Sequence, residues 1–277
     1  MSAEPVFIDF GTPDEVAAES QRYPDDVAAR LAGDAAQIIA RYPSARSALL
    51  PLLHLVQSVD GYITPAGIGF CAEQLALTPA EVTAVSTFYS MYRREETGDY
   101  LVGVCTNTLC AVMGGDQILA DLREHLGVET GQTTADGAIT LEHIECNAAC
   151  DYAPVVMVNW EFFDNQTPRS GRDLVDALRR GEPVTPTRGA PLCTFRETAR
   201  ILAGFPDERD GASDAAEPGA PTLAGHRIAR ERGMHAPDPT ASDDVAGPDE
   251  DRAAAESKAD KPAPAPSADV PSEGKAS

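Results

Sequence analysis

The chain has 277 residues, of which 43% are hydrophobic, and its formal net charge at pH 7 is -22. This length accommodates one large or two small domains, and the hydrophobic content is sufficient for a packed core. The strong negative charge argues against nucleic acid or an anionic membrane surface as a direct partner, because both require a basic protein surface.

The N-terminal residues 1–10 include acidic side chains where an export signal has basic ones, and they lack an apolar segment. The longest strongly apolar run, residues 48–56, is too short to cross a bilayer. We therefore expect a cytoplasmic protein with no direct membrane insertion. In that compartment the six cysteines are expected to be reduced, which favours metal binding over disulfides.

Residues 25–97 carry apolar residues at helical spacing and are predicted to form a small helical bundle, after an N-terminal extension over residues 1–24. Gly61 is predicted to end the second helix of the bundle. Thr78 and Glu81 have the spacing of a capping box, which predicts the start of the fourth helix. The expected helices begin near residues 26, 45, 65 and 79.

One motif in the bundle resembles a nucleotide-binding pattern. The run GIGFCA, residues 67–72, matches G-x-G-x-x-A, which binds a pyrophosphate only in the turn between a strand and a helix. The preceding YITP is instead a helix cap after another helix, so no nucleotide binding is expected there. Cys71, within this run, is interpreted as a small buried hydrophobic side chain, and His54 on the second helix as a packed or surface histidine rather than a ligand.

The periodicity changes at Gly98, and residues 98–182 are predicted to form a thioredoxin-like α/β domain. Its elements follow the order strand, helix, strand, strand, helix. The predicted strands are residues 100–104, 139–144 and 154–159, and residues 160–163 are expected to form a hairpin partner of the third. The predicted helices are residues 115–126 and a last helix that is capped by Thr167 and ends at residues 180–181.

The segment after this domain is predicted to be a short C-terminal extension, residues 183–205, with one helix over residues 195–202 and a buried thiol at Cys193. After Phe205 there are no aromatic residues, and residues 206–277 are predicted to be a disordered acidic tail, because they cannot bury enough apolar surface to offset their chain entropy. The predicted fold class is therefore α+β, a helical bundle followed by a thioredoxin-like α/β domain and a disordered tail.

Four cysteines follow the ends of predicted strands in two pairs, VCTNTLC with Cys105 and Cys110, and ECNAAC with Cys146 and Cys150. We refer to them as the four paired cysteines. Four thiolates can hold a zinc ion or a [2Fe-2S] cluster without another protein donor. The spacings C-x4-C and C-x3-C favour the two-iron cluster, because zinc sites usually have C-x2-C and a thioredoxin-type dithiol requires C-x-x-C. Zinc, disulfides and buried thiols remain alternatives on spacing alone.

The sequence around these cysteines resembles the 24 kDa subunit (E subunit) family of bacterial NADH-quinone oxidoreductase. The resemblance rests on VCTNTLC, TTADG, IECNAAC and APVVMVN, in this order and spacing, and covers about residues 25–182. It implies a thioredoxin-like ferredoxin domain with one [2Fe-2S] cluster on the four paired cysteines. Asn147 and Ala148 depart from the Leu-Gly or similar small pair usual in the family, which predicts altered hydrogen bonding beside the sulfurs.

The resemblance further implies an electron-transfer subunit of the NADH dehydrogenase module of a respiratory NADH-quinone oxidoreductase (a translocase), peripheral on the cytoplasmic side of the membrane. Its expected partners are a subunit that binds NADH and FMN and other iron-sulfur subunits, with neither NADH nor FMN bound to this chain. No catalytic residue is predicted, because a four-thiolate cluster has no open coordination position. The alternatives are the equivalent subunit of an NAD-linked formate dehydrogenase or hydrogenase diaphorase, and a zinc-stabilised adaptor without a redox role.

Overall fold

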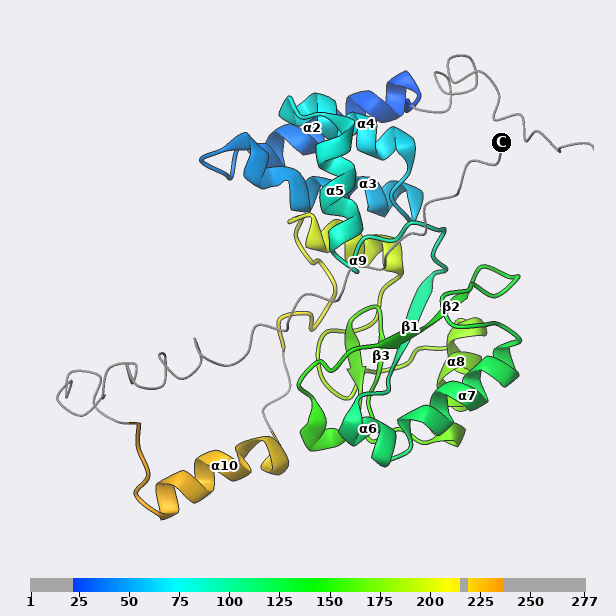
Figure 1. The fold of residues 1–277 in the computed structure, drawn as a ribbon, viewed down its shortest axis with the longest axis vertical. Helices are drawn as coiled ribbons and strands as arrows, with labels where there is room; N and C mark the ends of the chain where they lie inside the picture. Colours follow the sequence, from blue (N-terminus) through cyan, green and yellow to red (C-terminus); the bar gives the residue numbers. More distant parts are fainter. Residues whose placement is uncertain (1–21, 215–218, 237–277) are drawn as a thin grey trace, which may run out of the picture. The chain divides into compact units, whose positions relative to one another are not determined.

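The computed structural model describes residues 22–214 and 219–236 of the chain, and Figure 1 shows the order of their helices and strands. The chain divides into two units, one up to Thr222 and one from Leu223 onward. The first unit contains a helical bundle followed by a mixed four-stranded sheet with helices, which confirms the predicted α+β class. No helix among the described residues has the length and apolar character needed to span a bilayer.

The bundle forms because local capping signals and apolar spacing agree along residues 25–88. Gly61 ends α3 in the left-handed conformation, with φ at 81°, as predicted. Thr78 and Glu81 form the predicted capping box at the start of α5. The elements are α2 (Asp25–Ile39), the 3-10 helix η1 (Ala45–Ala48), α3 (Leu49–Asp60), α4 (Pro65–Leu75) and α5 (Pro79–Phe88).

The sheet has the strand order β2-β1-β3-β4, with β1 parallel to β2 and antiparallel to β3. The parallel pair requires a crossover, which α7 (Gly115–Leu126) provides, and α8 (Pro168–Arg179) packs beside α7. Both helices bury apolar faces on the same side of the sheet. The strands are β1 (Tyr100–Cys105), β2 (Ile139–Ile144), β3 (Val156–Val158) and β4 (Glu161–Phe163).

A two-residue turn joins β3 to β4, and both of its residues have positive φ, 47° at Asn159 and 71° at Trp160. Such turns match the twist of a hairpin, and asparagine tolerates the left-handed conformation well. The Asn159 side chain is buried and accepts a hydrogen bond from Leu101 N at 2.8 Å. Its Nδ2 donates to the carbonyls of Asp99 at 3.0 Å and Cys193 at 2.8 Å. Asn159 therefore ties the hairpin to β1 and to the C-terminal extension.

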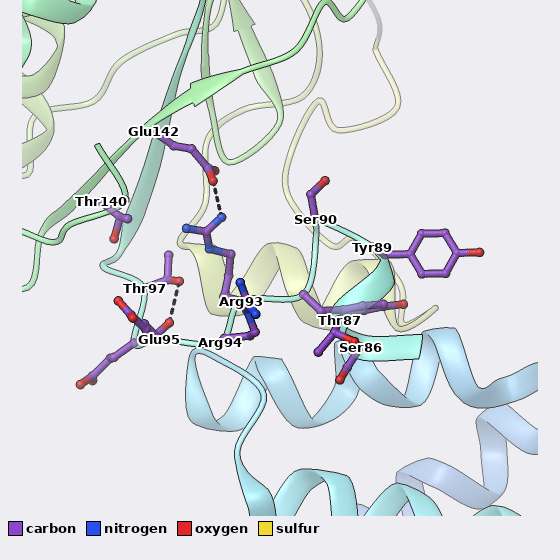
Figure 2. Close-up of a pocket in the computed structure, with 13 residues that line it drawn as sticks. Ser86, Thr87, Tyr89, Ser90, Arg93, Arg94, Glu95, Thr97, Thr140 and Glu142 are labelled. Carbon is purple, nitrogen blue, oxygen red and sulfur yellow. Dashed lines mark hydrogen bonds and ion pairs between the residues drawn. The ribbon is translucent and has the colours of Figure 1, made fainter. Parts of the chain in front are cut away.

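The segment between α5 and β1 is held by polar contacts on both sides. Gln57 is fully buried in α3, donates to Met91 O at 3.1 Å and accepts from Arg93 N at 2.8 Å. Arg93 Nη1 then pairs with Glu142 Oε1 of β2 at 2.6 Å, along a polar cavity of about 590 Å³ (Figure 2). This ion pair links the segment after α5 to the sheet. We therefore interpret the cavity as part of the contact region between the bundle and the sheet.

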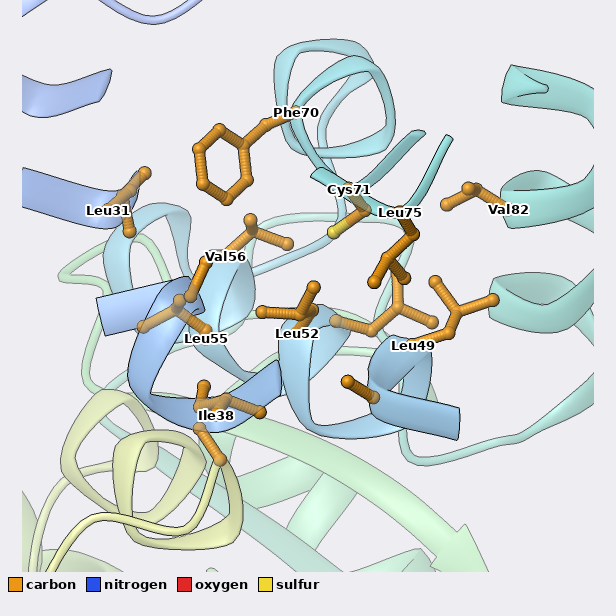
Figure 3. Packing of buried hydrophobic residues seen from close by; sticks show 14 of the residues in the cluster. Leu31, Ile38, Leu49, Leu52, Leu55, Val56, Phe70, Cys71, Leu75 and Val82 are labelled. Carbon is orange, nitrogen blue, oxygen red and sulfur yellow. The ribbon is translucent and has the colours of Figure 1, made fainter. Parts of the chain in front are cut away.

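The core of the bundle surrounds α3, whose apolar residues contact the neighbouring helices (Figure 3). Cys71 lies fully buried in this core, and burial raises the pKa of its thiol to about 12, so it stays a neutral packed side chain as predicted. His54 is also buried, with its ring 4.9 Å from that of Tyr92. α9 (Phe195–Leu202), predicted for the C-terminal extension, packs on α3, where Arg196 donates to Asp60 O at 3.1 Å.

Two helices were not predicted. α6 (Thr108–Val112) is one of them, and its five residues are too few for a periodic apolar pattern. The other is α10 (Ala220–Glu231), which lies within the predicted disordered tail, so that prediction was wrong for these residues. Good helix formers and an i,i+4 ion pair between Arg227 and Glu231 (3.8 Å) favour a local helix without a core, and α10 buries none of its residues. Residues 237–277 of the predicted tail lie outside the described residues.

Candidate metal centre

The four paired cysteines meet at one edge of the sheet. Cys105 is the last residue of β1, and Cys146 follows the end of β2 by two residues. Because β1 and β2 are parallel, their carboxyl ends lie side by side, with Cys105 opposite Ile144 in the register. The topology thus brings together two pairs that are far apart in the sequence, as loops at strand ends allow.

The first pair, Cys105 and Cys110, is buried, with 3% of each residue exposed. α6 carries Cys110, and a left-handed Gly114 (φ 113°) turns the chain into α7. Gly115, the first residue of α7, lies so close to this loop that an added Cβ would be 2.9 Å from Cys110 O. A side chain at position 115 would therefore displace the backbone of the first cysteine loop.

The second pair, Cys146 and Cys150, is exposed, and its sulfurs lie 3.5 Å apart without a disulfide. Ala148 between them has φ at 56°, a conformation that favours glycine, and its N–H donates to Cys146 Sγ at 3.4 Å. Asn147 Nδ2 donates to Glu145 O at 3.1 Å and makes no hydrogen bond to a sulfur among the described residues. The predicted hydrogen bonding of the Asn147 amide beside the sulfurs is therefore wrong, because this amide is directed to the backbone of Glu145.

The electrostatics of the four sulfurs depend on burial and on their mutual proximity. Burial and a hydrogen bond with Cys105 raise the pKa of Cys110 to about 11, against the lowering effect of a hydrogen bond from the Val155 backbone. The pKa of Cys150 is also raised, first by its hydrogen bond with Cys146 and further by the charge of Cys105. Since Cys150 perturbs Cys110 and Cys105 perturbs Cys150, the two pairs lie close enough to interact.

The donor set suits a two-iron cluster. The cysteines form two pairs, and a [2Fe-2S] cluster takes one pair on each iron. The first pair packs in an apolar cluster, whose other residues are Ala149, Ala153, Val155 and Met157 with Ile144, Trp160 and Phe162 beside them.

An exposed apolar surface lies beside the first pair. Leu109, Val112 and Met113, on α6 and directly after it, are 44%, 79% and 57% exposed. We call these three residues the α6 surface. The loop from Cys105 to Cys110 is a predicted partner surface, but its apolar character was not predicted because α6 itself was not predicted.

The remaining candidate residues lie elsewhere. Cys193 is half-buried, and its sulfur lies 3.2 Å from Thr198 Oγ1, outside the cysteine group. Residues 67–72 fall within α4, whose N-cap is Thr64, and not in a turn between a strand and a helix. Arg188, in the C-terminal extension, contacts the turn that carries Cys150, and no sequence signal marked it.

The chain is similar to known proteins over most of its length. Residues 35–179 match the family model of thioredoxin-like [2Fe-2S] ferredoxin. The chain is 63% identical over 247 residues to the E subunit of NADH-quinone oxidoreductase from Mycobacterium tuberculosis (strain H37Rv), covering 87% of this chain and 98% of that protein.

Among solved structures, an NAD+-reducing [NiFe]-hydrogenase matches with a TM-score of 0.44 and 19% identity, over 49% of this chain and 23% of that chain. A thioredoxin-like [2Fe-2S] ferredoxin from Aquifex aeolicus matches with a TM-score of 0.27 and 21% identity, over 32% of this chain and 87% of that chain.

Proposed function

Because the chain belongs to the E subunit family of NADH-quinone oxidoreductase, a family of thioredoxin-like [2Fe-2S] ferredoxins, we propose that it is an electron-transfer subunit of the NADH dehydrogenase module of a respiratory NADH-quinone oxidoreductase. In this role Cys105, Cys110, Cys146 and Cys150 hold one [2Fe-2S] cluster. The observation that carries the proposal is the convergence of these cysteines, as two pairs, at the carboxyl edge of β1 and β2.

When bound, such a cluster takes up and passes on one electron at a time, without an open coordination position for a substrate. The protein holds the sulfurs, shields Cys105 and Cys110 from water and donates hydrogen bonds to the sulfurs. The Ala148 N–H is directed at Cys146 Sγ, and the Val155 backbone bonds to the sulfur of Cys110. Hydrogen bonds of this kind tune the potential of a cluster.

The partner in this proposal is the subunit that binds NADH and FMN, with other iron-sulfur subunits beyond it and the whole attached to the cytoplasmic side of the membrane. The exposed second pair and the α6 surface support a contact at the cluster edge, since exposed apolar groups are common where proteins associate. NADH is not bound by this chain in the proposed role, because the nucleotide-like pattern of residues 67–72 lies within α4.

The high identity to an E subunit along almost its whole length favours the respiratory complex over an NAD-linked formate dehydrogenase or hydrogenase. The zinc-adaptor alternative is disfavoured by the match of residues 35–179 to the family model of thioredoxin-like [2Fe-2S] ferredoxin.

The carrier role is tested by titrating NADH into the cluster-loaded chain, alone and with the flavin-bearing partner. We expect no bleaching of the visible spectrum with NADH alone and rapid bleaching once the flavoprotein is added. Val112→Glu on the α6 surface is expected to weaken the association, whereas the matched control Leu202→Glu, at a residue 45% exposed on α9, leaves it unchanged. Bleaching by NADH without flavoprotein, or saturable NADH binding to the chain, would contradict the proposal.

A further inference from the structure

Arg188 lies in the C-terminal extension, beyond residues 35–179 that match the family model. Its guanidinium carbon is 5.0 Å from the ring centroid of Tyr152 and 4.8 Å from that of Phe162. Its Nη2 is 2.9 Å from Asp164 Oδ1 and 3.9 Å from Asp151 Oδ1. One side chain thus contacts two aromatic rings and two carboxylates.

The segment that carries Arg188 is itself fixed to the sheet. Residues Phe162 and Arg188 form an antiparallel bridge, and Thr187 N donates to Phe162 O at 2.8 Å. The Thr187 hydroxyl also lies 2.9 Å from Asp164 Oδ2, and the Asp164 side chain is only 7% exposed. Arg188 therefore projects from a rigid strand edge rather than from a loose connection.

The contacts of Arg188 converge on the turn that holds the fourth cysteine. This turn, η2 (Cys150–Tyr152), is a single 3-10 turn of three residues. Its own backbone hydrogen bonds are few, such as the one from Tyr152 N to Ala149 O at 3.1 Å. Such short turns have little stability by themselves, so tertiary contacts must fix the direction of Cys150. Arg188 contacts the other two residues of the turn, Asp151 and Tyr152.

We infer that Arg188 is a positioning residue for the iron-sulfur site: it clamps the Cys150 turn against β4 and supplies the positive charge beside it. The inference rests on the proposed function. A planar guanidinium lies flat on rings while its N–H groups pair with carboxylates, whereas a lysine ammonium is a compact charge with no flat surface to stack. Without Arg188, Asp151 and Asp164 leave two uncompensated negative charges beside the turn, which disfavours the addition of an electron to the cluster.

The test uses the full chain with Arg188→Gln, Arg188→Lys and the control Arg180→Gln. Arg180 is an exposed arginine paired with Glu182 at 2.6 Å, after α8. Hydrogen exchange of the peptide spanning residues 150–154 is measured in the metal-free chain. In the cluster-loaded chain, the rate of iron loss to a chelator and the midpoint potential are measured.

We expect Arg188→Gln to speed exchange and iron loss severalfold, and to shift the equilibrium with a redox dye about threefold toward the oxidised cluster, roughly 28 mV for one electron. Arg188→Lys restores the charge without the stacking, so its potential stays near the wild-type value while exchange and iron loss remain fast. Arg180→Gln matches the wild type in all three measurements. If Arg188→Gln fails to fold, hydrogen exchange and iron loss in Arg188→Lys test whether Arg188 fixes the Cys150 turn.

If a folded Arg188→Gln chain has the hydrogen exchange, iron retention and midpoint potential of the wild type, the inference about Arg188 is wrong, whereas the proposed function stands. If Arg188→Lys has wild-type hydrogen exchange and iron retention, Arg188 does not fix the Cys150 turn, and again the proposed function stands. A wild-type chain that takes up no iron and sulfide would instead overturn the proposed function and, with it, this inference.

Discussion

Replacing Asn159 by alanine is expected to destabilise the ferredoxin domain strongly. The change removes hydrogen bonds to Leu101 N, Asp99 O and Cys193 O, all made by a side chain that is 1% exposed. At about 1 kcal/mol for each bond the loss is about 3 kcal/mol. Alanine at a φ of 47° adds about 1 kcal/mol of backbone strain. The total of about 4 kcal/mol corresponds to a decrease in Tm of about 8–16 °C for a folded unit as long as the first one, which extends to Thr222.

Thermal unfolding followed by circular dichroism measures this effect, and Asn165→Ala provides a matched control. Asn165 also has a positive φ, 51°, but it is exposed, and the described part of the chain shows no hydrogen bond to its side chain. Its substitution should cost only the backbone strain, about 1 kcal/mol. If the two variants differ by less than about 1 kcal/mol, the buried hydrogen bonds of Asn159 do not anchor the hairpin and the reasoning fails.

Three further predictions concern the cysteines, the buried histidine and the C-terminal segment. Serine at any of the four paired cysteines should lower iron and sulfide content, whereas Cys71→Ser and Cys193→Ser should retain both; full retention in one of the four would remove that residue as a ligand. Burial lowers the pKa of His54 from 6.5 to about 4, so the unfolded chain binds its proton more readily and stability falls as the pH decreases from about 6.5 toward 4. Denaturant unfolding at pH 7 and pH 5 should show a loss about 2 kcal/mol larger in the wild type than in His54→Gln, and equal losses would refute the assignment. Truncation after Asp214 should shift Tm by less than about 4 °C, because α10 buries none of its residues; a larger decrease in a melting curve would show that the removed segment packs.

Local signals in the sequence were sufficient to predict most elements. The predicted bounds of α7 and β2 agree with the structure, and Gly61 and Thr78 mark the helix ends that their chemistry favours. The position of the candidate site was also predictable, because both cysteine pairs follow strand ends and parallel strands end at the same edge of a sheet.

The contacts that support the site were not predictable, because they join residues distant in the sequence. Arg188 contacts Tyr152, and Asn159 donates a hydrogen bond to Asp99. These residues are too far apart in the sequence for a periodic pattern to predict their contact. The predicted third strand, residues 154–159, is shorter in the structure, Val156–Val158, since Asn159 adopts the left-handed conformation and begins the turn. α6 was missed because a helix of five residues leaves no measurable period.

The metal content of the purified chain distinguishes an iron-sulfur protein from a zinc protein. Iron, acid-labile sulfide and zinc are measured together with the visible spectrum before and after chemical reduction. We expect a brown protein with about two iron and two sulfide per chain that bleaches partly on reduction and then gives the electron paramagnetic resonance signal of a one-electron-reduced [2Fe-2S] cluster. A colourless protein with about one tightly bound zinc per chain would contradict this expectation.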